Sequence, residues 1–341
     1  MGPEPDVLDR ILVVRLGSLG DLVHTLPAVS ALRRKFPDAR IDWVVDRPHA
    51  PFLALVPVVT RPIVLAGRTA AAWFEMRRTL RGERYDVALD FQGLIKSAIF
   101  ARMSGAGRVI GFDRRALREP AARWFYRERV DVAEGQHVIQ KNLRLAAALG
   151  ASTDRPEFPL GPIDSPAVAA LRDRGVDRFA LVNPGAAWPN KRWPPASFGR
   201  LARAILDRHR LRSVVLWGPG EAGLADEVVR ASDGAAVTAP PTTISDLVAL
   251  ARAASLVISG DTGPLHIAAA VGVPAVALFG PTNPRRNGPW DDADISISLY
   301  DRCDCHYERR CRRTADQWCL GTIGVDAVTR AVEQRLGPPT S

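Results

Sequence analysis

The chain has 341 residues, enough for two domains that each bury their own core, so a small stapled module is excluded. Hydrophobic residues make up 47% and charged residues 24%, values that exclude a disordered or collagen-like chain. The net charge of +9 favours anionic partners such as phosphorylated ligands, nucleic acid or an acidic lipid surface. Nearly all of this charge is arginine, because the only lysines are Lys35, Lys96, Lys141 and Lys191.

The beginning of the chain predicts no targeting segment. Residues 1–10 are acidic and interrupt any apolar run, unlike a signal or transit peptide. A stretch without charge at 262–284 is long enough to span a bilayer, but Pro264, Pro274 and Pro281 divide it. It therefore predicts a short helix and a strand, and we expect the protein to stay in the cytoplasm.

Short apolar runs and helical stretches alternate along the first half of the chain. Residues 10–16 form a β-branched run, a glycine turn follows at 17–20, and residues 21–35 carry apolar side chains at helical spacing. This alternation predicts a parallel, doubly wound sheet. Its further strands are expected at 41–45, 63–65, 87–90 and 109–111, and its further helices at 70–81 and 95–103.

The same alternation begins again near residue 179. Strands are expected at 179–183, 213–217, 256–259 and 275–279, and helices at 196–209 and 221–232. Residues 150–166 are rich in Pro, Ser, Asp and Gly, a composition typical of a linker. The sequence therefore predicts an α/β chain with Rossmann-like domains at 1–160 and 161–324, and a final helix in 325–341 that can pack on either domain.

Ligands of such sheets bind where the strands end, and the first strand is followed by Gly17-Ser-Leu-Gly-Asp21. The two glycines leave helix amides open to an anion, but their spacing is not that of dinucleotide-binding proteins, which disfavours NAD. Asp21 is either a carboxylate that stabilises the helix start or a general base. His24, one turn later, is expected to be a hydrogen-bonded packing residue.

Two loops of the second half also follow strands. Lys191 lies in a loop stiffened by Pro and Trp, where its charge is either solvated or placed to meet a phosphate. In Trp217-Gly-Pro-Gly-Glu221 the glycines allow a flat ligand to approach closely, and Glu221 can accept hydrogen bonds from ribose hydroxyls. A plain turn that caps a helix explains the same glycines.

The segment Ser259-Gly-Asp-Thr-Gly-Pro-Leu-His266 carries the strongest signal. It follows a strand and opens a helix, so Thr262, Gly263 and Pro264 are expected at the helix start. The free amides and the dipole of that start suit a pyrophosphate. Asp261 beside a phosphate is electrostatically unfavourable unless it binds sugar hydroxyls, and a purely capping role for this segment is the alternative.

All four cysteines are close together near the end of the chain, at Cys303, Cys305, Cys311 and Cys319, with His306 among them. Their spacing is not one of the standard paired zinc spacings. Reduced thiols are the favoured interpretation, with a bound metal or a redox disulfide as alternatives.

Taken together, these motifs resemble those of the heptosyltransferases of lipopolysaccharide inner-core synthesis, glycosyltransferase family 9. The resemblance covers nearly the whole chain, and the part around Gln92, Lys96 and Arg118 is most similar to members that add the first heptose to Kdo-lipid A. The matching segments are residues 16–28, 90–97, 118–120, 191–194, 260–266 and 279–282.

The resemblance implies a GT-B fold, with the acceptor on the first domain, ADP-heptose on the second, and a last helix in 325–341 that returns to the first domain. It also implies inversion at the anomeric carbon with no obligatory cofactor or metal. Asp21 would take the proton of the acceptor hydroxyl, and Lys191 would stabilise departing ADP. The donor would contact Gly218, Glu221, Asp261, Thr262, Gly263, Pro264 and His266, and the acceptor Gly20, Arg68, Gln92, Lys96 and Arg118.

The sequence also departs from the family pattern. Ala70-Ala-Ala72 precedes Trp73-Phe74, where members that act on Kdo-lipid A carry a denser basic cluster. A transferase that adds the second heptose, one that uses another nucleotide sugar, and a non-catalytic sugar-nucleotide-binding protein therefore stay open. Nucleic acid is disfavoured, because basic and aromatic residues are not interleaved. The expected partners are ADP-heptose, Kdo-lipid A and the anionic inner face of the inner membrane, where the protein would be peripheral.

Overall fold

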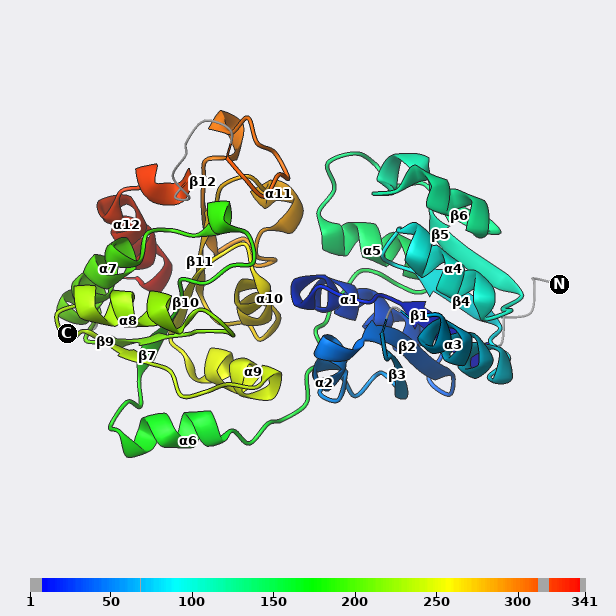
Figure 1. Ribbon diagram of the computed structural model, residues 1–341, viewed down its shortest axis with the longest axis horizontal. Helices are drawn as coiled ribbons and strands as arrows, with labels where there is room; N and C mark the ends of the chain where they lie inside the picture. Colours follow the sequence, from blue (N-terminus) through cyan, green and yellow to red (C-terminus); the bar gives the residue numbers. More distant parts are fainter. Residues whose placement is uncertain (1–7, 68, 312–318, 338–341) are drawn as a thin grey trace. The chain divides into compact units, whose positions relative to one another are not determined.

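In the computed structural model the chain forms two compact units, Met1–Pro162 and Ile163–Ser341 (Figure 1). The structure describes residues 8–67, 69–311 and 319–337. The division falls inside the stretch 150–166, whose Pro- and Gly-rich composition is typical of a linker. Within the described residues each unit contains one six-stranded parallel sheet, which confirms the predicted doubly wound α/β class.

The first unit is a parallel sheet with helices packed on it. Its strands are β1 (Arg10–Val14), β2 (Arg40–Asp46), β3 (Arg61–Leu65), β4 (Val87–Asp90), β5 (Arg108–Phe112) and β6 (Glu128–Val130). They pair in the order β3-β2-β1-β4-β5-β6. Its helices are α1 (Leu19–Lys35), η1 (Arg47–His49), α2 (Ala50–Leu53), α3 (Ala70–Gly82), α4 (Ile95–Met103), η2 (Arg114–Ala116), η3 (Pro120–Phe125) and α5 (Val138–Ala147). Ile11, Leu12, Val13 and Val14 are fully buried, as expected for a central strand covered on both faces.

The second unit repeats this plan. Its strands are β7 (Phe179–Asn183), β8 (Arg212–Val215), β9 (Ala236–Thr238), β10 (Leu256–Gly260), β11 (Ala275–Phe279) and β12 (Ile295–Ser298), in the order β12-β11-β10-β7-β8-β9. Its α-helices are α6 (Pro166–Asp173), α7 (Pro195–His209), α8 (Ala222–Ala231), α9 (Ile244–Ala253), α10 (Gly263–Ala270), α11 (Pro284–Asn287) and α12 (Val325–Leu336). Short 3-10 turns are η4 (Pro189–Lys191), η5 (Tyr300–Arg302) and η6 (Cys319–Thr322).

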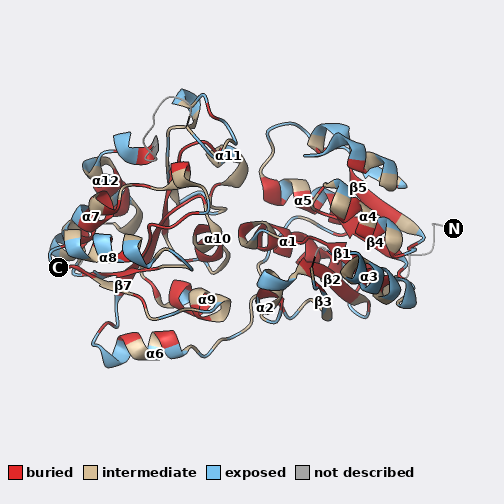
Figure 2. Cartoon of the chain, viewed as in Figure 1, coloured by how far each residue is buried: buried red, intermediate tan, exposed pale blue. Residues whose placement is uncertain are grey.

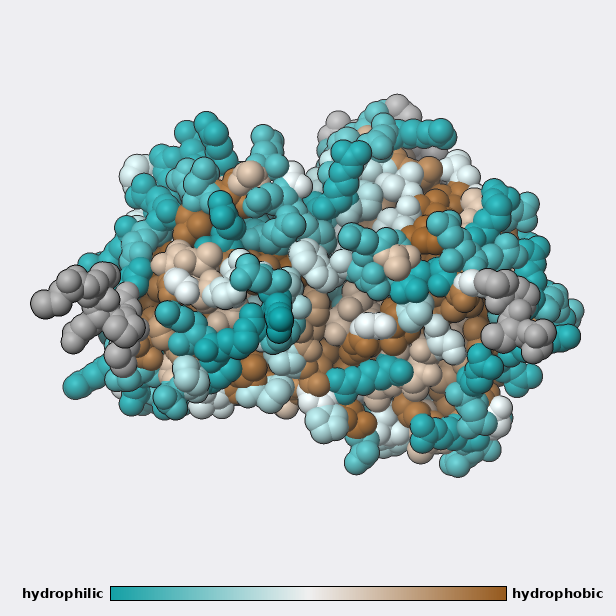
Figure 3. Space-filling model, turned by 180° about the vertical axis from the view of Figure 1, so that it is seen from behind, coloured by the Kyte–Doolittle hydropathy of each residue, from teal (hydrophilic) through white to brown (hydrophobic). Residues whose placement is uncertain are grey.

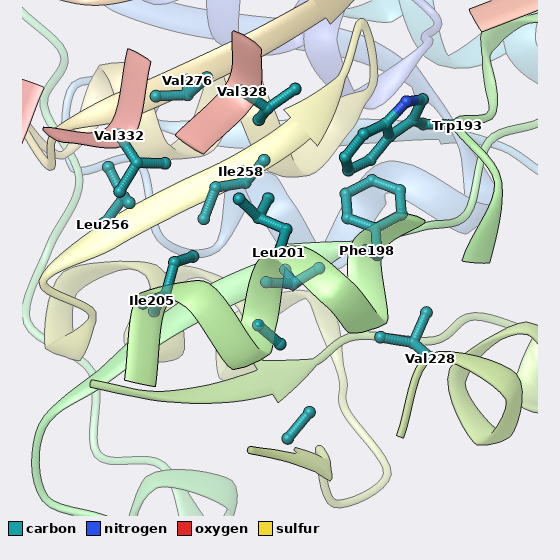
Figure 4. Packing of buried hydrophobic residues seen from close by; sticks show 14 of the residues in the cluster. Trp193, Phe198, Leu201, Ile205, Val228, Leu256, Ile258, Val276, Val328 and Val332 are labelled. Atoms are coloured by element: carbon teal, nitrogen blue, oxygen red, sulfur yellow. The ribbon is translucent and has the colours of Figure 1, made fainter. Parts of the chain in front are cut away.

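The core of the second unit lies between its sheet, α7 and α12 (Figure 4). Val328 and Val332 of α12 join the same buried cluster as Leu201 of α7 and Ile258 of β10. The final helix α12 packs against α7 and the sheet of the second unit. Its apolar stripe is complementary to α7, since both helices present buried side chains at helical spacing.

Burial follows the predicted pattern in both units. The central strands of each sheet are buried, the edge strands β3, β6 and β12 are partly exposed, and the outer sides of the helices are exposed (Figure 2). The face drawn in Figure 3 is covered by hydrophilic side chains with hydrophobic areas between them. Most expected strands and helices are present, but the sequence analysis missed β6, β9 and β12, which have only three or four residues, and helices α2, α5, α6, α9 and α11.

Each sheet has a position where the strand order reverses. In the first unit it lies between β1 and β4, and in the second between β7 and β10. In doubly wound sheets the helices leave such neighbouring strands in opposite directions, so the carboxyl ends border a crevice. The loops after these four strands carry most of the residues expected to bind ligands.

Candidate active site

The loops after β7 and β10 bring Lys191, Asp261 and His266 together. Lys191 Nζ lies 2.6 Å from Asp261 Oδ2, and His266 Nε2 lies 3.2 Å from Asp261 Oδ1. Side-chain exposure is 15% for Lys191, 4% for Asp261 and 6% for His266. A lysine expected in a loop and an aspartate 70 residues further along the chain thus form one buried charged cluster.

The environment of Asp261 keeps it ionised. Burial alone would raise the pKa of this carboxyl, because a charge is poorly solvated in the interior. The hydrogen bond from His266 and the charge of Lys191 outweigh burial and hold the pKa of Asp261 far below its usual range. A carboxylate held in this way can accept hydrogen bonds from sugar hydroxyls across the whole physiological pH range.

The start of α10 is free to meet an anion. Thr262 is the N-cap residue of this helix, but its side chain makes no capping hydrogen bond. Instead Thr262 Oγ1 accepts from Asn183 Nδ2 at 3.0 Å and lies 2.9 Å from Ser259 Oγ. Pro264 lies in the first turn, as predicted. The helix dipole and the first amides, with Gly263 at the first helical position, are therefore available to a negatively charged ligand.

The loop that carries Lys191 is seated closely on the strand ends. A Cβ at Gly260 would lie 2.7 Å from the carbonyl oxygen of Lys191, so only glycine permits this approach. Trp193, which follows closely, is 1% exposed and donates from Nε1 to the carbonyl of Ile323 at 2.9 Å. The buried indole anchors the loop and so places Lys191 beside Asp261.

Glu221 lies at the loop after β8, where the sequence analysis placed a ribose acceptor. Its Oε2 accepts from the amide of Gly218 at 3.2 Å, and its Oε1 lies 3.5 Å from Arg192 Nη2. A Cβ at Gly185 would lie 2.1 Å from Glu221 Oε2, so the carboxylate lies directly over that backbone. With 21% of its side chain exposed, Glu221 remains accessible to a ligand.

In the first unit Asp21 lies in the first turn of α1, after β1. Its Oδ2 accepts from the Ser18 amide at 3.0 Å and from the Ser18 hydroxyl at 3.2 Å. Its Oδ1 lies 2.5 Å from Nη2 of Arg15, and 38% of the side chain is exposed. Gly20 is buried beside it. The helix-stabilising contacts predicted for Asp21 are thus present, and an accessible carboxylate remains.

The other expected acceptor residues lie after β4 and β5. Gln92 Oε1 accepts from the amide of Leu16 at 2.8 Å, which joins the β1 and β4 loops. Lys96 Nζ lies 3.4 Å from Asp46 Oδ1, and Arg118 is exposed. Arg68 lies outside the described residues. The structure therefore brings Gln92 next to the loop of Asp21 and pairs Lys96 with a carboxylate.

The sequence analysis missed three residues of these sites. Arg15 is 8% exposed, donates from Nη1 to the carbonyl of Phe91 and pairs with Asp21. His49 follows β2 within the electrostatic range of Asp21; burial lowers the pKa of its imidazole, although Asp46 and Asp21 oppose that shift. Asn183 ends β7 and holds Thr262. Two of these residues had a signal in the sequence: Arg15 is a charged residue in an apolar run, and Asn183 is a polar residue at the end of a strand.

Among the described residues, no disulfide joins any two of Cys303, Cys305 and Cys311. Cys319 begins η6, but its side chain is outside the described part. Burial raises the pKa of the Cys303 thiol, although the hydrogen bond that the thiol accepts from the Cys305 amide opposes this shift. No group of three or more His, Cys, Asp or Glu side chains suited to a metal occurs among the described residues.

Two doubly wound α/β units are the architecture of the GT-B fold. The sequence pattern of Glycosyltransferase family 9 (heptosyltransferase) matches residues 73–316. The chain belongs to this family and is a glycosyltransferase.

Known relatives match over most of the chain. Lipopolysaccharide heptosyltransferase 1 of Pseudomonas aeruginosa is 33% identical over 325 residues, which cover 89% of this chain and 87% of that protein. Its counterpart in Salmonella typhimurium is 30% identical over 81% of this chain and 89% of that protein. The solved structure of E. coli heptosyltransferase WaaC with ADP is 25% identical with a TM-score of 0.78, and covers 96% of this chain and 99% of that one.

Proposed function

We propose that the protein transfers heptose from ADP-heptose to the Kdo-lipid A inner core of lipopolysaccharide, with inversion at the anomeric carbon. The observation that carries this proposal is the buried cluster of Lys191, Asp261 and His266 beside the open start of α10. The two curated relatives named above are lipopolysaccharide heptosyltransferases, and the WaaC structure contains ADP. These likenesses support heptose as the sugar and ADP as the leaving group.

The second unit would bind the donor. The diphosphate would lie against Lys191 and the amides of Thr262, Gly263 and Leu265 at the start of α10, where Pro264 has no N–H to donate. Asp261, which His266 and Lys191 keep ionised, would accept hydrogen bonds from the heptose hydroxyls. Gly218 and Glu221 would face the ribose, because the glycine allows close approach and the carboxylate accepts hydroxyl protons.

Departure of ADP places negative charge on the diphosphate while positive charge develops on the sugar. Donors held in a water-poor site stabilise such charge more than water does, because they need no reorganisation. Lys191 and the α10 amides would supply this stabilisation, and no metal would be required. The acceptor oxygen forms a bond to the anomeric carbon as the bond from that carbon to the phosphate oxygen breaks.

The acceptor hydroxyl loses its proton to Asp21 in this proposal. The carboxylate is accessible, and its contacts with Ser18 and Arg15 hold it in one orientation. Gln92, Lys96 and Arg118 would contact the acceptor, whose Kdo carboxylates and lipid A phosphates are anionic. Pairing with Asp46 orients Lys96 before the acceptor arrives.

The acceptor distinguishes this proposal from its alternative, a transferase that adds the second heptose. The test offers purified protein ADP-heptose, UDP-sugars and GDP-sugars, with either Kdo-lipid A or a heptosylated core as acceptor. Transfer from ADP-heptose to Kdo-lipid A supports the proposal. Transfer only to the heptosylated core would assign the second-heptose reaction, and use of another nucleotide sugar would overturn the donor.

The lipid part of the acceptor requires a protein that works at a membrane surface. In the described part of the chain, no helix combines the length and the apolar character of a membrane span. We infer peripheral association at the anionic inner face of the inner membrane, through the layer of α3, α4 and η3. Phe74 and Trp124 there are 68% and 70% exposed, and Arg123 lies 4.5 Å from the Trp124 ring centre.

Vesicle sedimentation tests this association. Binding to vesicles with anionic lipid should exceed binding to neutral vesicles and should weaken with salt. The double variant Phe74→Ser with Trp124→Ser should lose most of the binding. Tyr307→Ser, which removes an exposed aromatic ring from the second unit, is the matched control.

A further inference from the structure

The segment that contains the first three cysteines is attached to the loop that carries Lys191. The buried Asn190 donates from Nδ2 to the carbonyl of Glu308 at 2.7 Å. The amide of Tyr307 donates to the carbonyl of Pro281, after β11, at 2.9 Å. These two bonds hold residues 305–309 at the carboxyl ends of β7 and β11, in the region where the donor is proposed to bind.

Within this arrangement the indole of Trp188 has two cations near its ring. Lys191 Nζ is 4.7 Å from the ring centre, and the guanidinium carbon of Arg309 is 5.9 Å from it. A cation near an aromatic face is attracted by the electrons of the ring, so Trp188 helps to hold both charges. Arg309 and Lys191 are therefore both near the same aromatic ring, although 118 residues separate them in sequence.

The charges near this loop are not equally available to a ligand. Lys191 is paired with Asp261, and Arg192 is paired with Glu221. No ion pair involving Arg309 occurs among the described residues, and its side chain is exposed. A diphosphate carries at least two negative charges, and the carboxylate of Asp261 offsets most of what Lys191 offers. A further cation close by would compensate for this offset.

We propose that Arg309 is a second cation of the donor site and binds the diphosphate of the nucleotide sugar together with Lys191. This inference rests on the proposed function, because it adds a residue to the same donor site. A guanidinium presents a planar set of donors that suits phosphate oxygens. The role of the cysteine-containing segment would be to place the positive charge of Arg309 beside the leaving group.

The segment is held firmly enough for this role. Cys305 is 1% exposed, and the imidazole of His306 stacks on Tyr300 with ring centres 4.0 Å apart. The ring of Tyr307 lies 5.8 Å from the guanidinium carbon of Arg286. Arg309 thus extends from a segment fastened by a buried thiol, a ring stack and two backbone-directed hydrogen bonds.

The test compares Arg309→Met with Arg310→Met, which removes the same charge one residue further along. Calorimetry would measure the affinity of each full-length variant for ADP, AMP and adenosine at low and moderate salt. We expect Arg309→Met to weaken ADP about tenfold, AMP less, and adenosine not at all. Arg310→Met should stay within about twofold of the wild type, and Arg309→Lys should restore part of the ADP affinity.

Lys191→Met separates failure of this inference from failure of the proposed function. If the wild type does not bind ADP, or if Lys191→Met binds ADP as tightly as the wild type does, the proposed donor site is wrong. If Lys191→Met weakens ADP but Arg309→Met and Arg310→Met behave alike, Arg309 has no role in the site. Equal weakening of ADP and adenosine by Arg309→Met would also contradict the inference, because the lost contact would not be to the diphosphate.

Discussion

Arg15 and Asp21 form an ion pair in which Nη2 of the arginine lies 2.5 Å from Oδ1 of the aspartate. The arginine is 8% exposed and lies at the end of β1, where it also donates to the carbonyl of Phe91. One buried side chain thus connects the β4 loop to the proposed general base. This relationship predicts that Arg15 acts through Asp21 as a positioning residue.

A double-mutant cycle tests this coupling. Arg15→Met should lower kcat about ten- to hundredfold with little change in the KM for the donor, because a displaced base takes the proton less effectively. In an Asp21→Asn background the same substitution should have almost no further effect on kcat. Independent, multiplicative effects of the two substitutions would show that Arg15 has a merely structural role.

Asp21→Asn should by itself lower kcat more than about a hundredfold, since general-base catalysis contributes this much or more. Affinity for ADP should be unchanged, because the donor is proposed to bind the second unit. Rates with Kdo-lipid A and calorimetry with ADP provide the two measurements. Asp131→Asn, which alters an exposed carboxylate of the same unit, should leave both unchanged.

Lys191→Met should destabilise the protein by about 3 kcal/mol near neutral pH, because it leaves the buried Asp261 carboxylate without its cation. The pKa of Asp261 is lowered in the folded state, so its contribution to stability is present above the unfolded value of about 4 and is lost as the pH falls through the folded value. Removal of Lys191 raises the pKa of Asp261 in the folded state. The difference in stability between the wild type and Lys191→Met should therefore become smaller as the pH is lowered.

Urea denaturation of the wild type and Lys191→Met at several pH values measures this difference. The double variant Lys191→Met with Asp261→Asn is the control, because it removes the buried charge along with its partner. The free energy of unfolding of this double variant should depend less on pH than that of Lys191→Met alone. A difference between wild type and Lys191→Met that stays constant across pH would mean that the ion pair contributes little to stability.

Gly260→Ala should weaken donor binding and lower stability. The added Cβ would lie 2.7 Å from the carbonyl oxygen of Lys191 and would push the loop away from the strand. Gly223→Ala in α8 is the matched control, because its Cβ meets no atom within 4 Å and alanine favours a helix by about 1 kcal/mol. Comparable loss of ADP affinity in both variants would contradict the importance of this close approach.

A metal requirement can be tested directly. The proposal assigns leaving-group stabilisation to Lys191 and the α10 amides, so transfer in excess EDTA should proceed within about twofold of the rate with added Mg²⁺. Complete loss of transfer in EDTA, restored by a divalent cation, would require a metal in the donor site.

The elements and the strongest motifs were predictable because their signals are local. The run at 10–16 and the helical spacing of 21–35 predicted β1 and α1, and the prolines at 262–284 predicted α10 and β11. β6 and β9 have three residues each, too few for periodicity to separate a strand from a turn. Hydrophobic spacing likewise gives no reason for α12 to prefer one unit.

The relationships within the sites were less predictable because they connect distant parts of the chain. Lys191 and Asp261 were each predicted as ligand-binding residues, but their pairing depends on β10 lying beside β7. Arg15 meets Asp21 because it is held by the carbonyl of Phe91, 76 residues away. Arg309 approaches Trp188 through a hydrogen bond between Asn190 and Glu308. No spacing in the sequence encodes these contacts.

The central claim is that Asp21 of the first unit and Lys191 of the second carry heptose transfer from ADP-heptose. The most direct measurement follows ADP release and product mass when purified wild type, Asp21→Asn and Lys191→Met act on ADP-heptose and Kdo-lipid A. The account predicts one ADP released for each heptose added by the wild type, and near-complete loss of both in either variant. Full activity in both variants, or no heptose transfer by the wild type to any inner-core acceptor, would contradict it.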